Sequence, residues 1–225
     1  MTTLDTIYLK DAYGNPFPAA VVPIGASSGP LNAAAHVLLD QYGDALATPN
    51  NPLLCSPLQL VAVANFTRPS NSTPYTDGAL IANSASAGSV VPLAWTVARV
   101  AGGSLSIVRA RLKKSSTTIF EALMRLHLYS QSPTPAHGDG GLWLTPSSGY
   151  IGSFTFDFRG VNSRVFSDSA KVIATPDVGA LQIVETVAPS QQIYGLLEYI
   201  APASGDTYTP AHAEVFTGSL EVTQN

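Results

Sequence analysis

The chain has 225 residues, only 12% of them charged, and a formal net charge of −4. Because about a quarter of the residues in typical soluble domains are charged, much of this surface must be neutral, which lowers the cost of removing it from water in a protein–protein contact. The acidic net charge argues against nucleic acid as a partner. The single cysteine, Cys55, excludes an internal disulfide bond. The absence of a signal-peptide pattern or long apolar run indicates a soluble protein made in a cytoplasm, with no membrane partner.

The first 58 residues are predicted to form an extended, proline-rich arm. They hold 7 of the 17 prolines and two copies of the pattern Asp-x-Tyr-Gly, at residues 11–14 and 40–43. Asp and Gly favour turns, so each copy predicts a small hairpin or extended piece. The arm is poor in large apolar side chains and cannot offset its own folding entropy, so we expect it to become ordered only against a partner surface. Its candidate contact residues are Tyr13 and Tyr42.

Residues 59–225 are predicted to form one β domain. Short apolar runs recur with turn residues between them, as strands do, and several alternate with period two: Phe154, Phe156 and Phe158 share one face. About eight to ten strands favour a jelly-roll-like antiparallel β-sandwich, in which closure protects the sheet edges. The runs are residues 60–67, 79–82, 90–97, 105–113, 123–129, 152–158, 171–174, 181–187, 193–200 and 214–222.

Three local features are less regular. Val108 follows the alternation and is expected to face the core. Gly102 and Gly103 lie between two of the runs and predict a hairpin turn there. Residues 119–126 fit a helical stripe as well as a strand, so both structures remain open for that segment.

Catalytic chemistry has few candidates in this sequence. His137, Asp139 and His212 could bind a metal or form part of a triad, but no further ligand lies at a suitable spacing. Residues 133–141 have loop composition, which predicts a solvated loop. The G-x-S-x-G pattern at residues 25–29 lies between two prolines and predicts a linker rather than a nucleophile turn. We therefore expect no catalytic residue, no metal and no cofactor.

The strongest charge feature is basic. Three cations, Arg109, Arg111 and Lys113, are expected on one face of one strand, and this face is either solvated or bound to an acidic protein partner or a neighbouring subunit. Nucleic acid is the least favoured reading, because no aromatic residues interleave with the cations. Six of the eleven cations lie within 27 positions: Arg99, Arg109, Arg111, Lys113, Lys114 and Arg125.

The two tryptophans are predicted to have different roles. Trp95 lies in an expected strand and belongs to the core. Trp143 is near a loop, where it would be exposed for protein contact or for stacking on a sugar.

Five segments of the β domain carry a resemblance to a known family: YTDGALIANS (75–84), VVPL (90–93), LSIVRARL (105–112), RLHLY (125–129) and IYGLL (193–197). They resemble structural proteins of tailed bacteriophages that decorate or cement the capsid. The resemblance covers roughly residues 58–225, and the arm with its Asp-x-Tyr-Gly turns is similar to the N-terminal part of phage head proteins.

The resemblance implies a virion location, a jelly-roll-like domain and homotrimers seated on the lattice of the major capsid protein, and it brings no catalytic residues. The sequence is therefore expected to be that of a capsid decoration protein. One alternative is a receptor- or glycan-binding fibre tip, with Trp143 and Tyr150 in a groove. A second is a glycan hydrolase, which needs two facing carboxylates, and no telling pair is evident.

Overall fold

A computed structural model describes residues 7–10, 16–19, 58–178 and 182–224. The chain divides into two units, residues 1–56 and 57–225. In the first unit, β1 (Ile7–Lys10) and β2 (Pro16–Ala19) form an antiparallel pair on either side of the first Asp-x-Tyr-Gly copy. This pair agrees with the hairpin predicted there. The second copy, Tyr13, Tyr42 and the G-x-S-x-G segment lie outside the described residues.

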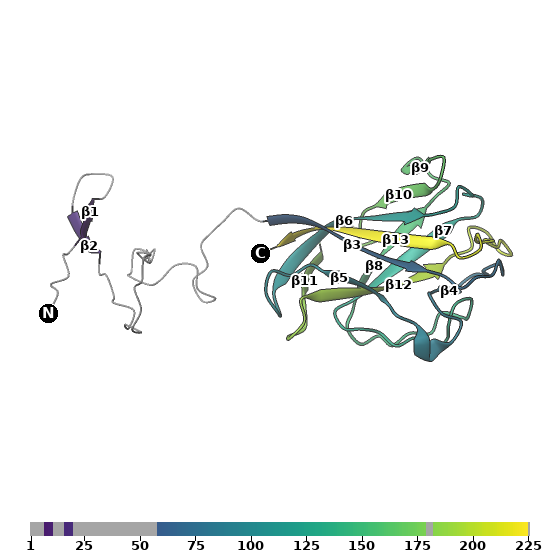
Figure 1. The fold of residues 1–225 in the computed structure, drawn as a ribbon, viewed down its shortest axis with the longest axis horizontal. Coiled ribbons are helices and arrows are strands. Elements are labelled where there is room, and N and C mark those ends of the chain that lie inside the picture. The colour runs from purple at the N-terminus through teal and green to yellow at the C-terminus, as the bar shows by residue number, and fades with distance from the viewer. Residues whose placement is uncertain (1–6, 11–15, 20–57, 179–181, 225) are drawn as a thin grey trace, which may run out of the picture. The chain divides into compact units, whose positions relative to one another are not determined.

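The second unit is a β-sandwich of two antiparallel sheets, as the alternating sequence predicts (Figure 1). A short 3-10 helix, η1 (Ala87–Ser89), precedes β5. The first sheet runs, in spatial order, through β3 (Leu58–Thr67), β13 (Val215–Gln224), β6 (Ser104–Lys114), β10 (Ala170–Ala174) and β9 (Ser163–Val165), with β11 (Gln182–Glu185) beside the first half of β6. In the second sheet, β4 (Leu80–Ile81) and β5 (Leu93–Thr96) both pair with β12 (Gln192–Tyr199), which is followed by β7 (Leu123–Tyr129) and β8 (Tyr150–Asp157).

The order of pairing is nested along the chain. Within the second unit, the first strand β3 pairs with the last strand β13, and β5 pairs with the next-to-last, β12. Further inward, β6 pairs with β10, and β7 pairs with β8. Strands that lie far apart in the sequence are therefore neighbours, and both ends of this unit lie together at one sheet edge.

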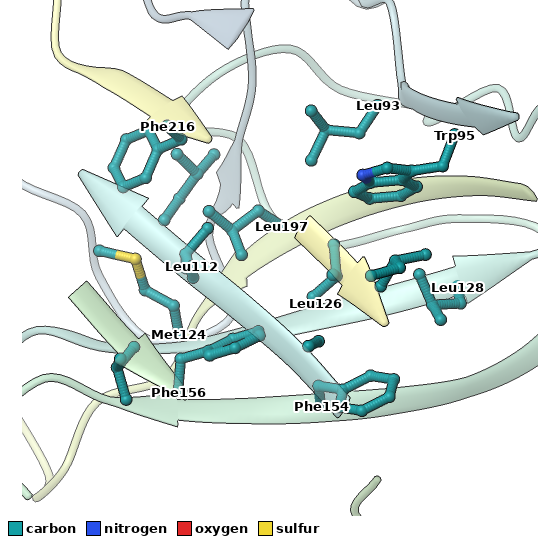
Figure 2. Packing of buried hydrophobic residues seen from close by; sticks show 14 of the residues in the cluster. Leu93, Trp95, Leu112, Met124, Leu126, Leu128, Phe154, Phe156, Leu197 and Phe216 are labelled. Atoms are coloured by element: carbon teal, nitrogen blue, oxygen red, sulfur yellow. The ribbon is translucent and has the colours of Figure 1, made fainter. Parts of the chain in front are cut away.

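The core fills the space between the sheets, and Leu112 from β6 and Leu126 from β7 belong to the same buried cluster (Figure 2). Trp95 is 1% exposed, as predicted, and its indole Nε1 donates a hydrogen bond of 2.9 Å to the carbonyl oxygen of Gly218. A Cβ atom added at Gly195 would lie 2.7 Å from the indole ring, and one at Gly218 would lie 2.8 Å from it. These two glycines therefore make the space that the largest core side chain occupies.

The structure contradicts the predictions for Val108 and for the turn at residues 102–103, and it decides between strand and helix for residues 123–129. Val108 is 36% exposed because the register of β6 against β13 shifts there, which is a β-bulge that turns this residue away from the core. Residues 102–103 form a turn, but β5 and β6 belong to different sheets, so the turn is a crossover rather than a hairpin. Residues 123–129 are a strand, not part of a helix.

No described segment forms a helix with the length and hydrophobicity that crossing a bilayer requires.

Candidate contact surface and buried polar network

The outer face of the first sheet carries the predicted basic strand. Arg109, Arg111 and Lys113 all lie on it, alternating with buried neighbours. Arg109 Nε donates a hydrogen bond of 2.7 Å to Glu221 on β13, and Arg111 also forms an ion pair with Glu221. Two of the three predicted contact cations therefore share one carboxylate of their own sheet, which partly neutralises them.

Lys113 lies in a different environment from the two arginines. It is directly opposite Lys171 on β10, and Lys171 is directly opposite Arg164 on β9. Within the described residues, none of these three side chains forms an ion pair with a carboxylate. Like charges at directly opposite positions destabilise a sheet. We call Lys113, Lys171 and Arg164 the basic row.

Next to these cations, the same sheet presents a face with little charge. Its two largest exposed apolar side chains are Val61 and Val63, which are 52% and 58% exposed. Only Glu221 among its outward residues is charged, and the two arginines already pair with it. We call this set the neutral face: Gln59, Val61, Val63, Asn65 and Thr67 on β3, and Val215, Thr217, Ser219, Glu221 and Thr223 on β13.

Trp143 differs from the exposed residue that the sequence predicts. Its ring stacks on the imidazole of His127 at a centroid distance of 4.2 Å and packs beside a small cluster around Leu196. Beneath it, His127 Nε2 lies 2.8 Å from Glu198 Oε2. The stacking partner comes from β7 and could not be read from the loop sequence. Tyr150, at 47% exposed, is the more accessible aromatic residue of this region.

Lys114, which the sequence groups with the surface cations, points into the molecule and is fully buried. Its ammonium group lies 3.4 Å from Glu214 Oε1 and donates hydrogen bonds to the carbonyl oxygens of Ser116 and Thr118. Glu214 in turn accepts a hydrogen bond of 2.8 Å from the Tyr208 hydroxyl group. The contacts of Lys114 and Glu214 therefore connect the segment after β6 to the segment before β13.

Asp139 is not a solvated loop residue, so that prediction is wrong. Its side chain is 4% exposed and forms an ion pair of 3.0 Å with Arg68, whose side chain is 1% exposed. It also accepts hydrogen bonds from the Tyr75 hydroxyl group (2.5 Å) and the Ala82 backbone N–H (2.9 Å). The backbone N–H of Asp139 donates a hydrogen bond of 2.7 Å to the Ser84 carbonyl oxygen, and the loop packs so closely there that a Cβ atom at Gly138 would lie 2.2 Å from the backbone of Ala85.

The two histidines behave as the loop interpretation predicts. His137 and His212 are both exposed. Among the described residues, no group of three or more His, Cys, Asp or Glu side chains is placed to hold a metal ion.

Lys114, Glu214 and Tyr208, together with Arg68, Asp139 and Tyr75, form the buried polar network, and burial shifts the pKa values of several of its groups. Burial and the nearby Asp139 carboxylate raise the pKa of Tyr75, and burial and Glu214 raise the pKa of Tyr208. Burial also raises the pKa of Tyr199 to about 12. Above the ordinary tyrosine pKa, the unfolded chain loses these protons first, so the free energy of unfolding must fall. Burial lowers the pKa of Lys114, and this shift has the opposite effect, because the unfolded chain keeps a proton that the folded chain releases.

The side chains of this network are buried and join separate segments of the fold. Shifted pKa values often mark active sites, but the Lys114 and Glu214 side chains are 0% exposed, and a substrate cannot reach them.

A shallow groove of about 510 Å³ lies elsewhere, between β3 and the segment leading into β5. None of the residues that line this groove is titratable: Ala64, Asn65, Phe66, Thr67, Asn83, Val91, Pro92, Leu93 and Ala94.

In comparisons with known proteins, no family model matches the chain and no curated protein matches it in sequence.

Proposed function

We propose that this protein decorates and stabilises the capsid of a tailed bacteriophage by binding the outer shell as an oligomer, most simply a homotrimer. Its partners are then the major capsid protein and further copies of itself, and its role is mechanical rather than catalytic. Two features support the proposal: the phrases that resemble capsid decoration proteins, and the nested strand pairing, which is the order expected for a jelly roll.

The neutral face is the observation that carries the proposal. Two adjacent strands present valines and uncharged polar side chains, with one carboxylate that is already paired. Removing such a face from water costs little, so it suits packing against another protein. Several copies joined together bind a repeating lattice much more tightly than one copy does. The same face serves a trimer contact or a contact with the shell.

Replacing Val63 by Asp tests this surface directly. A carboxylate at the centre of the neutral face must be desolvated in any contact there. V63D should therefore weaken capsid binding, either directly where the face meets the shell or through loss of the trimer where the face lies between copies. Val100 is a matched control, because it is 60% exposed against 58% for Val63 but lies in the turn before β6. Sedimentation equilibrium and co-sedimentation with capsids lacking the protein give the two measurements.

The proposal predicts that wild-type protein and V100D form the same oligomer and decorate capsids equally, whereas V63D decorates them more weakly. A wild-type protein that remains a monomer of 23.5 kDa and leaves capsids bare would contradict the proposal.

A receptor- or glycan-binding fibre tip is the second candidate, and exposed Tyr150 beside the Trp143–His127 stack favours it. Aromatic faces are suited to stacking on sugar rings. This candidate predicts that Tyr150→Ala abolishes binding of the protein to host cell-surface glycans and leaves its association with capsids unchanged. Equal glycan binding by wild type and Y150A would exclude the site.

A further inference from the structure

The basic row is energetically unfavourable within the folded domain alone. Lys113, Lys171 and Arg164 lie abreast on three neighbouring strands, with adjacent Cα atoms at the distance of directly opposed sheet residues. Arg164 donates hydrogen bonds to the carbonyl oxygens of Val161 and Ser163, which hold its guanidinium group without neutralising it. A single acidic residue at the central position would relieve both repulsions, yet that position is a lysine. Stability given up in this way often reflects a functional requirement.

The surroundings of the row indicate the chemistry of its partner. Two of its cations are lysines, which are point charges that suit separate carboxylates better than the paired geometry that arginine prefers. Ile173 projects from the same face of β10, is 42% exposed and lies two residues from Lys171. No aromatic side chain occurs among the described outward residues of β6, β10 and β13, and Phe166, two residues after Arg164, is a single exposed ring. Binding of single-stranded nucleic acid typically uses several such rings, on which successive bases stack. An acidic polypeptide with an apolar side chain fits all of these features.

We propose that the basic row, together with Ile173, is a docking site for an acidic polypeptide segment of another protein. Three cations meet carboxylates of the partner, and Ile173 contacts an apolar side chain beside them. Arg109 and Arg111, which the sequence ranks equally with Lys113, contribute less because Glu221 already neutralises them in part. The proposal rests on the capsid function only for the identity of the partner, which is then a protein of the outer shell.

The test uses the full chain and a fluorescein-labelled oligo-glutamate peptide, with fluorescence anisotropy as the readout. Lys171→Glu reverses the central charge and should weaken peptide binding about tenfold or more. The same change creates favourable pairs with Lys113 and Arg164, so it should raise Tm by about 2–4 °C. Loss of binding in a protein of increased stability cannot be attributed to unfolding.

Two control variants complete the design. Arg99→Glu makes the same change in net charge at an exposed cation outside the sheet and should leave peptide affinity unchanged. Lys171→Arg keeps the charge and should bind like the wild type. Binding should also weaken strongly as the ionic strength rises, because exposed charges are screened by salt.

Three outcomes would overturn the inference. In the first, K171E binds the peptide as tightly as the wild type. In the second, a single-stranded oligonucleotide binds the row more tightly than the peptide, which identifies a nucleic-acid site. In the third, K171E has a lower Tm than the wild type, which removes the argument from repulsion. If peptide binding holds but virions lack the protein, the docking site stands and the capsid function fails.

Discussion

Replacing Asp139 by Ala tests whether this residue is buried and ion-paired, as the structure shows, or solvated, as the loop composition predicts. The substitution leaves the Arg68 guanidinium group buried without its carboxylate and removes the acceptor of the Tyr75 hydroxyl group and of the Ala82 N–H. Breaking a buried ion pair by removing one partner costs about 3–5 kcal/mol. Because Tm falls by about 2–4 °C per kcal/mol in a domain of this size, the decrease should be roughly 6–20 °C.

Two matched variants separate the causes of this loss. Asp139→Asn keeps one carbonyl oxygen and nearly the same shape but removes the charge. Its free energy of unfolding should therefore lie between those of the wild type and D139A. His137→Ala, two positions away and exposed, should change the free energy of unfolding by no more than about 0.5 kcal/mol. Urea denaturation followed by circular dichroism measures all three. A D139A protein within about 0.5 kcal/mol of the wild type would show that Asp139 is solvated.

Three further predictions concern the rest of the chain. Gly195→Ala should destabilise the fold by about 1–3 kcal/mol because its Cβ would meet Trp95, whereas Gly88→Ala, with no atom within 4 Å, should not; equal denaturation midpoints would contradict the packing. The free energy of unfolding should fall as pH rises above about 10.5, by roughly 1.4 kcal/mol per pH unit for each tyrosine that stays protonated, because the opposing effect of Lys114 ends near its ordinary pKa. A flat profile between about pH 10.5 and about 12 in denaturant titrations would refute the raised pKa values. A truncated protein starting near Leu58 should melt cooperatively but bind capsids more weakly than the full chain; aggregation, or full-strength binding, would show that the two parts of the chain are not separable.

Local pattern was sufficient to predict most of the strands, but it missed β9 (Ser163–Val165), which is short and has no apolar run. Alternation at Phe154, Phe156 and Phe158 placed all three in the core, because side chains in a strand point to opposite faces in turn. The same rule contains a signal that the sequence interpretation missed. If Lys113 faces outward, its neighbour Lys114 must face inward, and a buried lysine requires a carboxylate partner.

Register and long-range partners could not be predicted in this way. Asp139 pairs with Arg68, 71 positions earlier, and loop composition gives no information about such a partner. The basic row depends on which residues of three strands lie opposite one another, and period-two patterns do not define that register. The outward turn of Val108 depends on one extra residue in β6 relative to β13, which is visible only when both strands are aligned.

If the proposed function holds, a tailed phage encodes this chain, and electron cryomicroscopy of purified virions of that phage tests the central claim most directly. The account predicts β-sandwich density on the outer surface of the capsid, in oligomers that repeat with the lattice, with the neutral face turned toward a sister copy or the shell. Capsids without such density, or β-sandwich density found only at the tail or fibre tip, would contradict it.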